Sequence, residues 1–249
     1  MAFFESPNAR LWKDTAYLEF VVGSETPCDV EIGGQFDKVG GEMVTSRIQF
    51  GDYISYLDMA IASNEDGETD GSDQTTAPTP KLIETQNIVY LAQNELFDGL
   101  MRDFTPPKFC TDGSIGRGNL YATKIWIGPY GTVSPLHYDP LDNVLLQFVG
   151  EKVVTLYPPV VKKTMTTTTL LEETDVDYYY AGLGPSGQMN VSAVDVERLD
   201  FEKYPNFRLA PRGLKVRLGE GDMLFIPKRW WHHVRGDSVW SMSLNCWWD

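Results

Sequence analysis

The sequence predicts a mainly β fold, a barrel or sandwich of antiparallel strands with helices packed on its N-terminal side. Composition supports this first, because 22 glycines and 15 prolines among 249 residues suit strands and turns better than a helix bundle. The chain after Thr123 supports it second, because short apolar runs there alternate with Gly, Pro, Asp and Glu. The clearest helical spacing lies before that point, which places the helices on the N-terminal side.

The N-terminal half carries three predicted elements in front of the barrel. Residues 17–22 form a strand or a helix, and residues 29–32 form a strand that ends at two glycines. The run 88–97, IVYLAQNELF, predicts a strand that continues into a short helix. An amphipathic helix is expected from about Phe50, since apolar residues recur near helical spacing at Ile48, Tyr53, Ile54, Leu57 and Ile61.

The C-terminal half carries the predicted barrel strands. They are KIWIG, VLLQFVG, KVVTLYP, LKVRLG, MLFIP, WHHVRG and SVWSMSLNCWW. The threonine-rich segment 164–188 has no clear period and predicts a long mobile loop, and 194–204 predicts a short helix. The acidic segment 63–80 has almost nothing to bury and predicts a mobile surface insertion. It is too short to join independent units, so we expect one domain over residues 1–249.

Charge and cysteine content narrow the class of protein. The net charge of −14 disfavours nucleic acid as a partner and favours basic partners, although plain solubility explains it equally well. Cys28, Cys110 and Cys246 lie far apart without a CxxC, which argues against a disulfide framework or a thiolate zinc site. No secretory signal or membrane-spanning run is visible. We therefore expect a soluble protein of the nucleus or cytoplasm.

All three histidines lie in two short stretches, SPLHYDPLDN and WWHHVRG. Residues two apart on a strand share a face, so His137 and Asp139 are expected to point the same way. His232 or His233, from a later strand, could supply a third ligand. Two imidazoles and one carboxylate on one side of a metal ion are typical of the facial triad of non-haem iron(II) oxygenases.

A lysine is predicted on the same inner face. If the pleat continues from His137, Asn143 shares its face, and VGEK predicts a two-residue hairpin that pairs Val149 with Lys152. A lysine inside a barrel is costly unless an anion meets it, and a bound dicarboxylate would be such an anion. Simpler explanations are a chance HxD, a hydrogen-bonded core histidine and a solvated turn lysine.

The stretches SPLHYDPLDNVLLQFVGEKVVTLYPP and GEGDMLFIPKRWWHHVRG and the final NCWW together resemble the Jumonji-C family. The resemblance runs from about Cys28 to the C-terminus. It implies a double-stranded β-helix, which is a cupin-like jelly roll, and oxygenase activity with iron(II), 2-oxoglutarate and dioxygen. YLAQNELF and DVEIGG are most similar to the branch of Jumonji-C domain-containing protein five, also called lysine-specific demethylase eight.

The resemblance implies a role for each candidate residue. His137, Asp139 and His232 would bind iron as the catalytic triad, with His233 as the fallback ligand. Lys152 would bind the distal carboxylate of 2-oxoglutarate. Tyr90, Ser134 and Asn143 would contact 2-oxoglutarate. Trp126 and Trp247 would form the walls of the pocket. Glu31 and Gln93 would face the substrate.

The leading functional hypothesis is a protein hydroxylase that acts on a basic side chain, similar to an arginyl hydroxylase. A histone lysine or arginine demethylase is the first alternative. WWHHV and the run 194–207 also resemble an asparaginyl hydroxylase, and a non-catalytic metal-binding cupin module is a further alternative. The insertions at 63–80 and 164–188 fall where substrate-contacting loops are expected, so the substrate need not follow that of the relatives.

Overall fold

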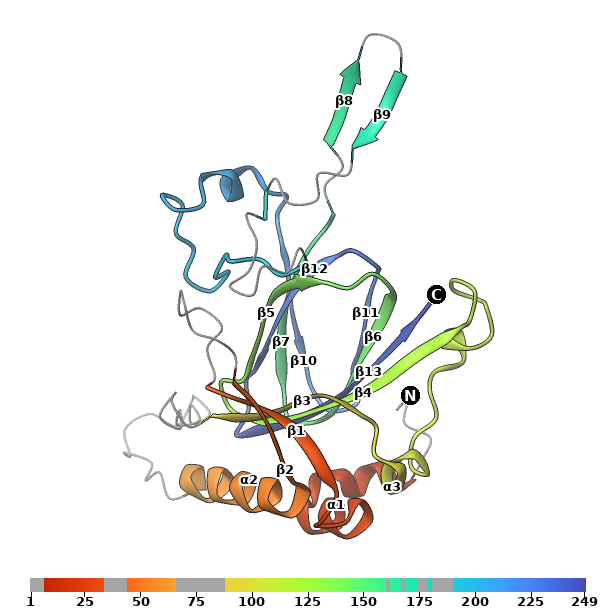
Figure 1. Cartoon of the computed structure of the whole chain (residues 1–249), viewed down its shortest axis with the longest axis vertical. Coiled ribbons are helices and arrows are strands. Elements are labelled where there is room, and N and C mark those ends of the chain that lie inside the picture. Colours follow the sequence, from red (N-terminus) through yellow and green to blue (C-terminus); the bar gives the residue numbers. More distant parts are fainter. Residues whose placement is uncertain are drawn as a thin grey trace, which may run out of the picture.

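The computed structural model describes residues 7–33, 44–65, 88–159, 162–166, 169–173, 179–180 and 190–249. Two antiparallel sheets face each other and enclose a barrel (Figure 1). The mainly β jelly-roll architecture predicted from the sequence is confirmed. That the chain forms one domain stays a prediction.

Successive barrel strands along the chain alternate between the two sheets. The larger sheet has the order β11 (Met223–Ile226), β6 (Asp142–Val149), β13 (Trp240–Trp248), β4 (Leu120–Pro129), β3 (Val89–Glu95), β1 (Pro27–Ile32) and β2 (Val44–Gln49). The smaller has the order β10 (Leu214–Leu218), β7 (Lys152–Tyr157), β12 (Trp231–Gly236) and β5 (Val133–Tyr138). From β4 to β7, and again from β10 to β13, each strand lies in the sheet opposite to the one before it. This alternation places residues from distant parts of the chain on facing walls.

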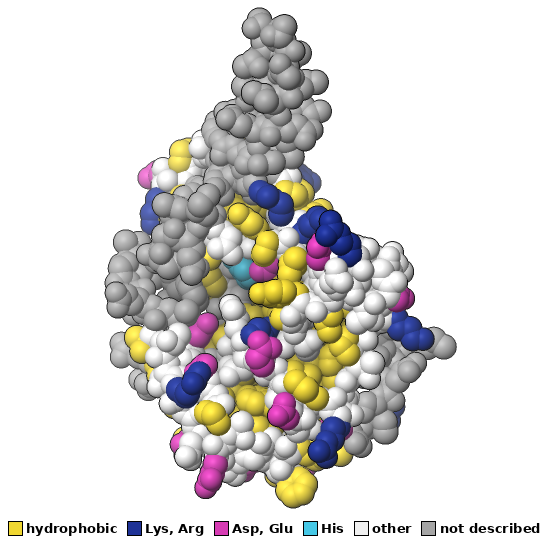
Figure 2. Space-filling view, turned by 45° about the vertical axis from the view of Figure 1, so that its right-hand side comes forward, with side chains coloured by type: hydrophobic (Ala, Val, Ile, Leu, Met, Phe, Trp, Pro, Cys, Tyr) yellow, Lys and Arg dark blue, Asp and Glu magenta, His cyan; other side chains and the backbone are white. Residues whose placement is uncertain are grey.

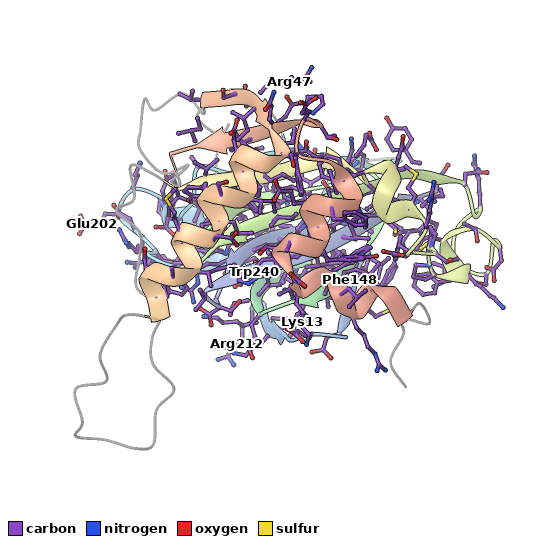
Figure 3. The ribbon with its side chains drawn as sticks, turned by 90° about the horizontal axis from the view of Figure 1, so that it is seen from below. Lys13, Arg47, Phe148, Glu202, Arg212 and Trp240 are labelled. Carbon is purple, nitrogen blue, oxygen red and sulfur yellow. The ribbon has the colours of Figure 1, made fainter. Side chains whose placement is uncertain are left out.

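Helices cover the outer face of the larger sheet (Figure 3). They are α1 (Thr15–Val22), α2 (Phe50–Glu65), α3 (Asp98–Met101) and the 3-10 helix η1 (Pro7–Lys13). Residues 17–22, for which a strand and a helix were both open, are therefore helical. Phe148, labelled in Figure 3, stacks on Trp12 of η1 with ring centroids 4.5 Å apart. The apolar face of α2 is buried through Tyr53, Ile54 and Leu57, as its spacing predicts.

The predicted helix at 194–204 is wrong. This stretch forms bends and turns, and only the 3-10 helix η3 (Pro205–Leu209) follows it. The carboxylate of Asp195 accepts hydrogen bonds from the backbone N–H groups of Glu197 and Arg198. Asp200 does the same for the two residues at 202 and 203. These local turns compete with helical hydrogen bonding, although the residue pattern is apolar enough for a helix.

The predicted loop at 164–188 is wrong for its described part. Strands β8 (Lys162–Thr166) and β9 (Thr169–Glu173) pair as a hairpin that projects from the barrel (Figure 1). The threonines that obscured any period are β-branched and favour extended backbone. Residues 63–65 of the other predicted insertion belong to α2. The rest of both segments, apart from Tyr179 and Tyr180, lies outside the described residues.

Two further properties bear on the protein class. No helix in the described ranges combines the length and the apolar character needed to cross a membrane. Cys28, Cys110 and Cys246 are buried free thiols.

Candidate metal centre and co-substrate pocket

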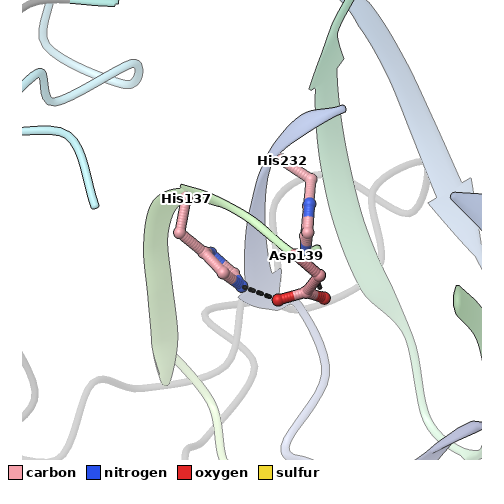
Figure 4. Close-up of side chains that lie close together, drawn as sticks. All are labelled: His137, Asp139 and His232. Carbon is pink, nitrogen blue, oxygen red and sulfur yellow. Dashed lines mark ion pairs between the residues drawn. The ribbon is translucent and has the colours of Figure 1, made fainter. Parts of the chain in front are cut away.

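His137, Asp139 and His232 lie close together, on or just after the paired strands β5 and β12 (Figure 4). Strands β5 and β12 are paired, and His232 lies directly opposite His137 in their register. Asp139 follows one residue after β5 ends. Its two carboxylate oxygens lie 4.0 Å from His137 Nε2 and 3.6 Å from His232 Nε2. One ligand atom from each of the three side chains lies within 4.8 Å of the others, which is close enough to share a metal ion.

Backbone carbonyls orient both imidazole rings. His137 Nδ1 lies 2.7 Å from Pro135 O, and His232 Nδ1 lies 3.0 Å from Trp230 O. A carbonyl can only accept, so each Nδ1 must carry the proton and donate it. The Nε2 lone pairs then point toward Asp139 and remain free for a metal. Burial, followed by charge on His137, lowers the pKa of His232 to about 4, so that ring is neutral near pH 7.

The carboxylate of Asp139 is held on one side. Trp247 Nε1 donates to Oδ2 at 2.8 Å, and Asn143 Nδ2 donates to the same oxygen at 3.1 Å. Burial alone would raise the pKa of Asp139. Positive charge on the two histidines and these two hydrogen bonds outweigh burial and lower the pKa, so the group is ionised near pH 7.

The structure separates the two adjacent histidines. His233 is as buried as His232, at 5% and 3% exposure, but it is not part of the cluster of potential ligands. Consecutive residues on a strand point to opposite faces, so His233 faces away from the barrel interior. Burial lowers the pKa of His233 to about 4, with smaller contributions from charges that include Asp195 and Arg235. His232 is therefore the histidine positioned beside His137 and Asp139.

Lys152 lies deeper in the same pocket, where it is 2% exposed. Its Nζ donates to Ser243 Oγ at 2.6 Å and to Tyr90 OH at 3.4 Å. Ser134 is hydrogen-bonded to Tyr90 in turn. No carboxylate of the described chain segments lies within ion-pair distance of this amine. Burial lowers the pKa of Lys152 to about 7, and an anion that entered the pocket would favour the charged form of this amine.

Lys152 points inward for a different reason from the one predicted. The expected hairpin pairing of Val149 with Lys152 is wrong, because β6 and β7 lie in opposite sheets. Val149 pairs with Met242, and Lys152 pairs with Leu218 and Gly236. The two residues at 150 and 151 carry the chain from one sheet to the other. The continuous pleat from His137 to Asn143 is wrong for the same reason, since β5 and β6 face each other across the barrel.

The larger sheet supplies the opposite wall. The predicted residues Tyr90, Trp126, Asn143 and Trp247 line the pocket together with Ser134, Lys152 and the three potential metal ligands. Sequence reasoning missed Asn245, whose Nδ2 donates to Asn143 Oδ1 at 2.8 Å. It also missed Ser243, the partner of Lys152. Both lie on β13 at two-residue spacing from Trp247, so the strand period could have found them.

The two predicted substrate-facing residues do not line this pocket. Glu31 lies on β1 beside Tyr90, half-buried, and burial raises its pKa to about 7. Gln93 is exposed at an irregularity in the pairing of β3 with β4, with a backbone φ of 54°. The structure thus brings Glu31 next to a pocket residue and leaves Gln93 at the surface.

The donor set fits a divalent first-row metal. Two imidazoles and one carboxylate are intermediate ligands that bind such ions with positions left open. Hydrogen bonds fix both rings and the carboxylate, as expected of metal ligands. The buried amine of Lys152 lies in the same pocket and lacks a carboxylate partner among the described residues, which fits an anionic co-substrate.

Loss of the indole hydrogen bond to Asp139 should weaken the metal site. We expect Trp247→Phe to lower the affinity for Mn²⁺ by about tenfold, because Asp139 loses its shorter hydrogen bond. Titration followed by electron paramagnetic resonance measures this affinity. Trp126→Phe is the matched control, because Trp126 lines the same pocket while its buried Nε1 has no hydrogen-bond partner in the described structure. An equal loss in both variants would contradict a role for the hydrogen bond.

Known proteins resemble the chain along nearly all of its length. The family described as "Cupin-like domain" matches residues 9–249. The chain is 30% identical over 246 residues to Jumonji C domain-containing protein 5 of Drosophila melanogaster, which covers 98% of this chain and 52% of that protein. It is 36% identical over 246 residues to Lysine-specific demethylase JMJ30 of Arabidopsis thaliana, an alignment that covers 98% of this chain and 47% of that protein. It is 36% identical over 175 residues to Lysine-specific demethylase 8 of Xenopus tropicalis, an alignment that covers 69% of this chain and 35% of that protein. The chain thus spans about half the length of these relatives, or less.

Proposed function

The chain belongs to the cupin-like Jumonji-C family, and on that premise we propose that it is an iron(II)- and 2-oxoglutarate-dependent oxygenase acting on a protein side chain. One observation carries the proposal. The cluster of His137, Asp139 and His232 shares a pocket with the buried amine of Lys152, for which the described residues provide no carboxylate. Metal ligands alone would suit many proteins, whereas the added cation suits an anionic co-substrate beside the metal.

Each pocket residue has a defined task in this proposal. His137, Asp139 and His232 would hold iron(II), and Lys152 would bind the distal carboxylate of 2-oxoglutarate with Tyr90 and Ser134. When bound, the iron and its co-substrate would supply oxidation of a substrate C–H bond by dioxygen, with release of succinate and carbon dioxide.

The protein itself would contribute orientation and exclusion of water. Trp247 and Asn143 hold one carboxylate oxygen of Asp139, which leaves the other free toward the metal position. Trp126 and Trp247 line the pocket with apolar ring surface, which limits water around the reacting groups.

The substrate class divides the proposal into two candidates. Hydroxylation of a basic side chain is supported by the net charge of −14 and by the half-buried carboxyl of Glu31 beside the pocket. Demethylation of a basic side chain is supported by the names of two relatives, which are called lysine-specific demethylases. The same oxidation on an N-methyl group would release formaldehyde. For either reaction we place the protein in the nucleus or cytoplasm, because its three thiols are free.

Mass spectrometry distinguishes the candidates. The protein is incubated with iron(II), 2-oxoglutarate, and peptides that carry arginine or methylated lysine. A gain of one oxygen supports hydroxylation, and loss of a methyl group with formaldehyde supports demethylation. Succinate formation should accompany either one and should disappear in Asp139→Ala. If the metal binds without succinate formation on any peptide or protein extract, the non-catalytic module is favoured.

A further inference from the structure

Arg229 has an unusual backbone conformation next to the metal site. It lies in the connection 227–230 between β11 and β12, three residues before His232. Its φ is 66°, and Gln93 is the only other non-glycine residue in the described ranges with a positive φ. This left-handed region favours glycine, because a side chain there crowds the backbone. Arg229 is the third residue of a turn closed by the hydrogen bond from Trp230 N–H to Pro227 O, a place where glycine is the usual residue.

Hydrogen bonds fix this connection to the loop that carries Asp139. The Arg229 N–H donates to the backbone carbonyl of Asp139 at 2.8 Å. The N–H of Lys228 donates to Asp142 Oδ1 at 2.9 Å. Arg229 is therefore placed beside two of the three potential metal ligands, His232 through the chain and Asp139 through a hydrogen bond.

The guanidinium of Arg229 contacts an aromatic ring but has no carboxylate partner among the described residues. It lies over the ring of Tyr138, 5.7 Å from the centroid, and Tyr138 in turn packs edge-on against Trp231. The residue is exposed, and none of the described carboxylates lies within ion-pair distance. Arg217 and Arg235 differ, because each is paired with two carboxylates.

Part of the site reaches the molecular surface (Figure 2). Figure 2 shows the cyan histidine side chain and a neighbouring magenta carboxylate at the surface, surrounded by hydrophobic side chains, with Lys and Arg side chains gathered close by. The guanidinium contacts the face of the Tyr138 ring at cation–π distance, and a guanidinium without an ion-pair partner can bind a carboxylate through two N–H groups.

We propose that Arg229 determines substrate specificity by binding an acidic side chain of the substrate, next to the residue that enters the pocket. The proposal rests on the proposed function and narrows its substrate class. A substrate with a basic target and an acidic neighbour would match both the pocket and its rim. The overall negative charge of the protein repels acidic segments of a substrate. A local cation such as Arg229 would therefore be needed to bind an acidic residue beside the target.

Selection from a peptide library tests this assignment. The full chain is loaded with Mn²⁺ and 2-oxoglutarate and selects from peptides whose central position is randomised and whose flanking positions are Asp, Asn, Ala or Ser. We expect about tenfold enrichment of Asp over Asn at one flanking position, from a charge-assisted hydrogen bond. Arg229→Ala should lose this preference. Lys228→Ala, which removes the adjacent exposed cation, should keep it.

Arg229→Gly separates the side chain from the backbone. Glycine accepts the left-handed conformation, so this variant should melt no lower than the wild type while also losing the preference for Asp. A wild type without that preference, or an Arg229→Ala variant that retains it, would overturn the proposal. Mn²⁺ and 2-oxoglutarate binding by the wild type are measured separately, so a failed co-substrate site can be distinguished from a failed specificity contact.

Discussion

Lys152→Met is expected to abolish 2-oxoglutarate binding and, at the same time, to stabilise the protein without co-substrate. Lys152 is buried and hydrogen-bonded only to hydroxyls, so the co-substrate would be its carboxylate partner. Removing one member of such a buried charge pair should lower the affinity by at least about a hundredfold. Calorimetric titration of the Mn²⁺-loaded protein measures this. Lys124→Met, which removes a surface lysine paired with Glu95, should leave co-substrate binding unchanged.

The stability gain of Lys152→Met should depend on pH. Burial lowers the pKa of Lys152 from 10.5 to about 7, so the unfolded chain binds an additional proton between these values. The free energy of unfolding of the wild type therefore rises with pH in that window, and folding with this lysine costs up to about 4 kcal/mol near pH 7. Urea unfolding should give a difference between variant and wild type that is largest at and below about pH 7 and shrinks as the pH rises toward 10.5. A difference that does not change with pH would contradict the burial of an unpaired amine.

His232→Ala is expected to lose metal binding, whereas His233→Ala is expected to retain it. Both imidazoles are buried, and burial lowers the pKa of each to about 4, so neither variant changes the charge near pH 7. Of these two adjacent histidines, only His232 has its Nε2 beside Asp139. Loss of a direct ligand should cost more than the loss of a supporting hydrogen bond, so we expect the Mn²⁺ affinity to fall by more than about a hundredfold.

Thermal unfolding is the control for this pair of variants. His233 packs at the outer face of β12, so its truncation should lower the melting temperature without weakening the metal. A His233→Ala variant that folds but binds Mn²⁺ as poorly as His232→Ala would contradict the assignment of ligands.

The cluster of candidate metal ligands could be predicted from the sequence because it depends on local spacing. His137 and Asp139 are two residues apart at the end of a strand, and the only other histidines are adjacent to each other. The inward position of Lys152 agrees with the prediction, but the prediction reached it through a hairpin that does not exist. The turn at 150–151 is short enough for a hairpin, and local sequence does not encode that β6 and β7 lie in opposite sheets. Strand partners are set by contacts distant in the sequence.

Polar contacts account for the other differences. Asp195 and Asp200 form turns with the backbone where the apolar pattern alone predicted a helix. On β13, Ser243 and Asn245 point inward with Trp247, yet serine and asparagine have no apolar periodicity to mark them. Their shared face follows from two-residue spacing along β13, but their partners Lys152 and Asn143 follow from contacts that only the folded structure provides.

An anaerobic titration with iron(II) and 2-oxoglutarate tests the central claim most directly. A 2-oxo acid coordinated to iron(II) would give a visible charge-transfer absorption band, which would report a shared site. We predict one equivalent of bound iron, a band in the wild type, and no band in either Asp139→Ala or Lys152→Met. A wild type that binds iron but gives no band with 2-oxoglutarate, or variants that keep the band, would contradict the account.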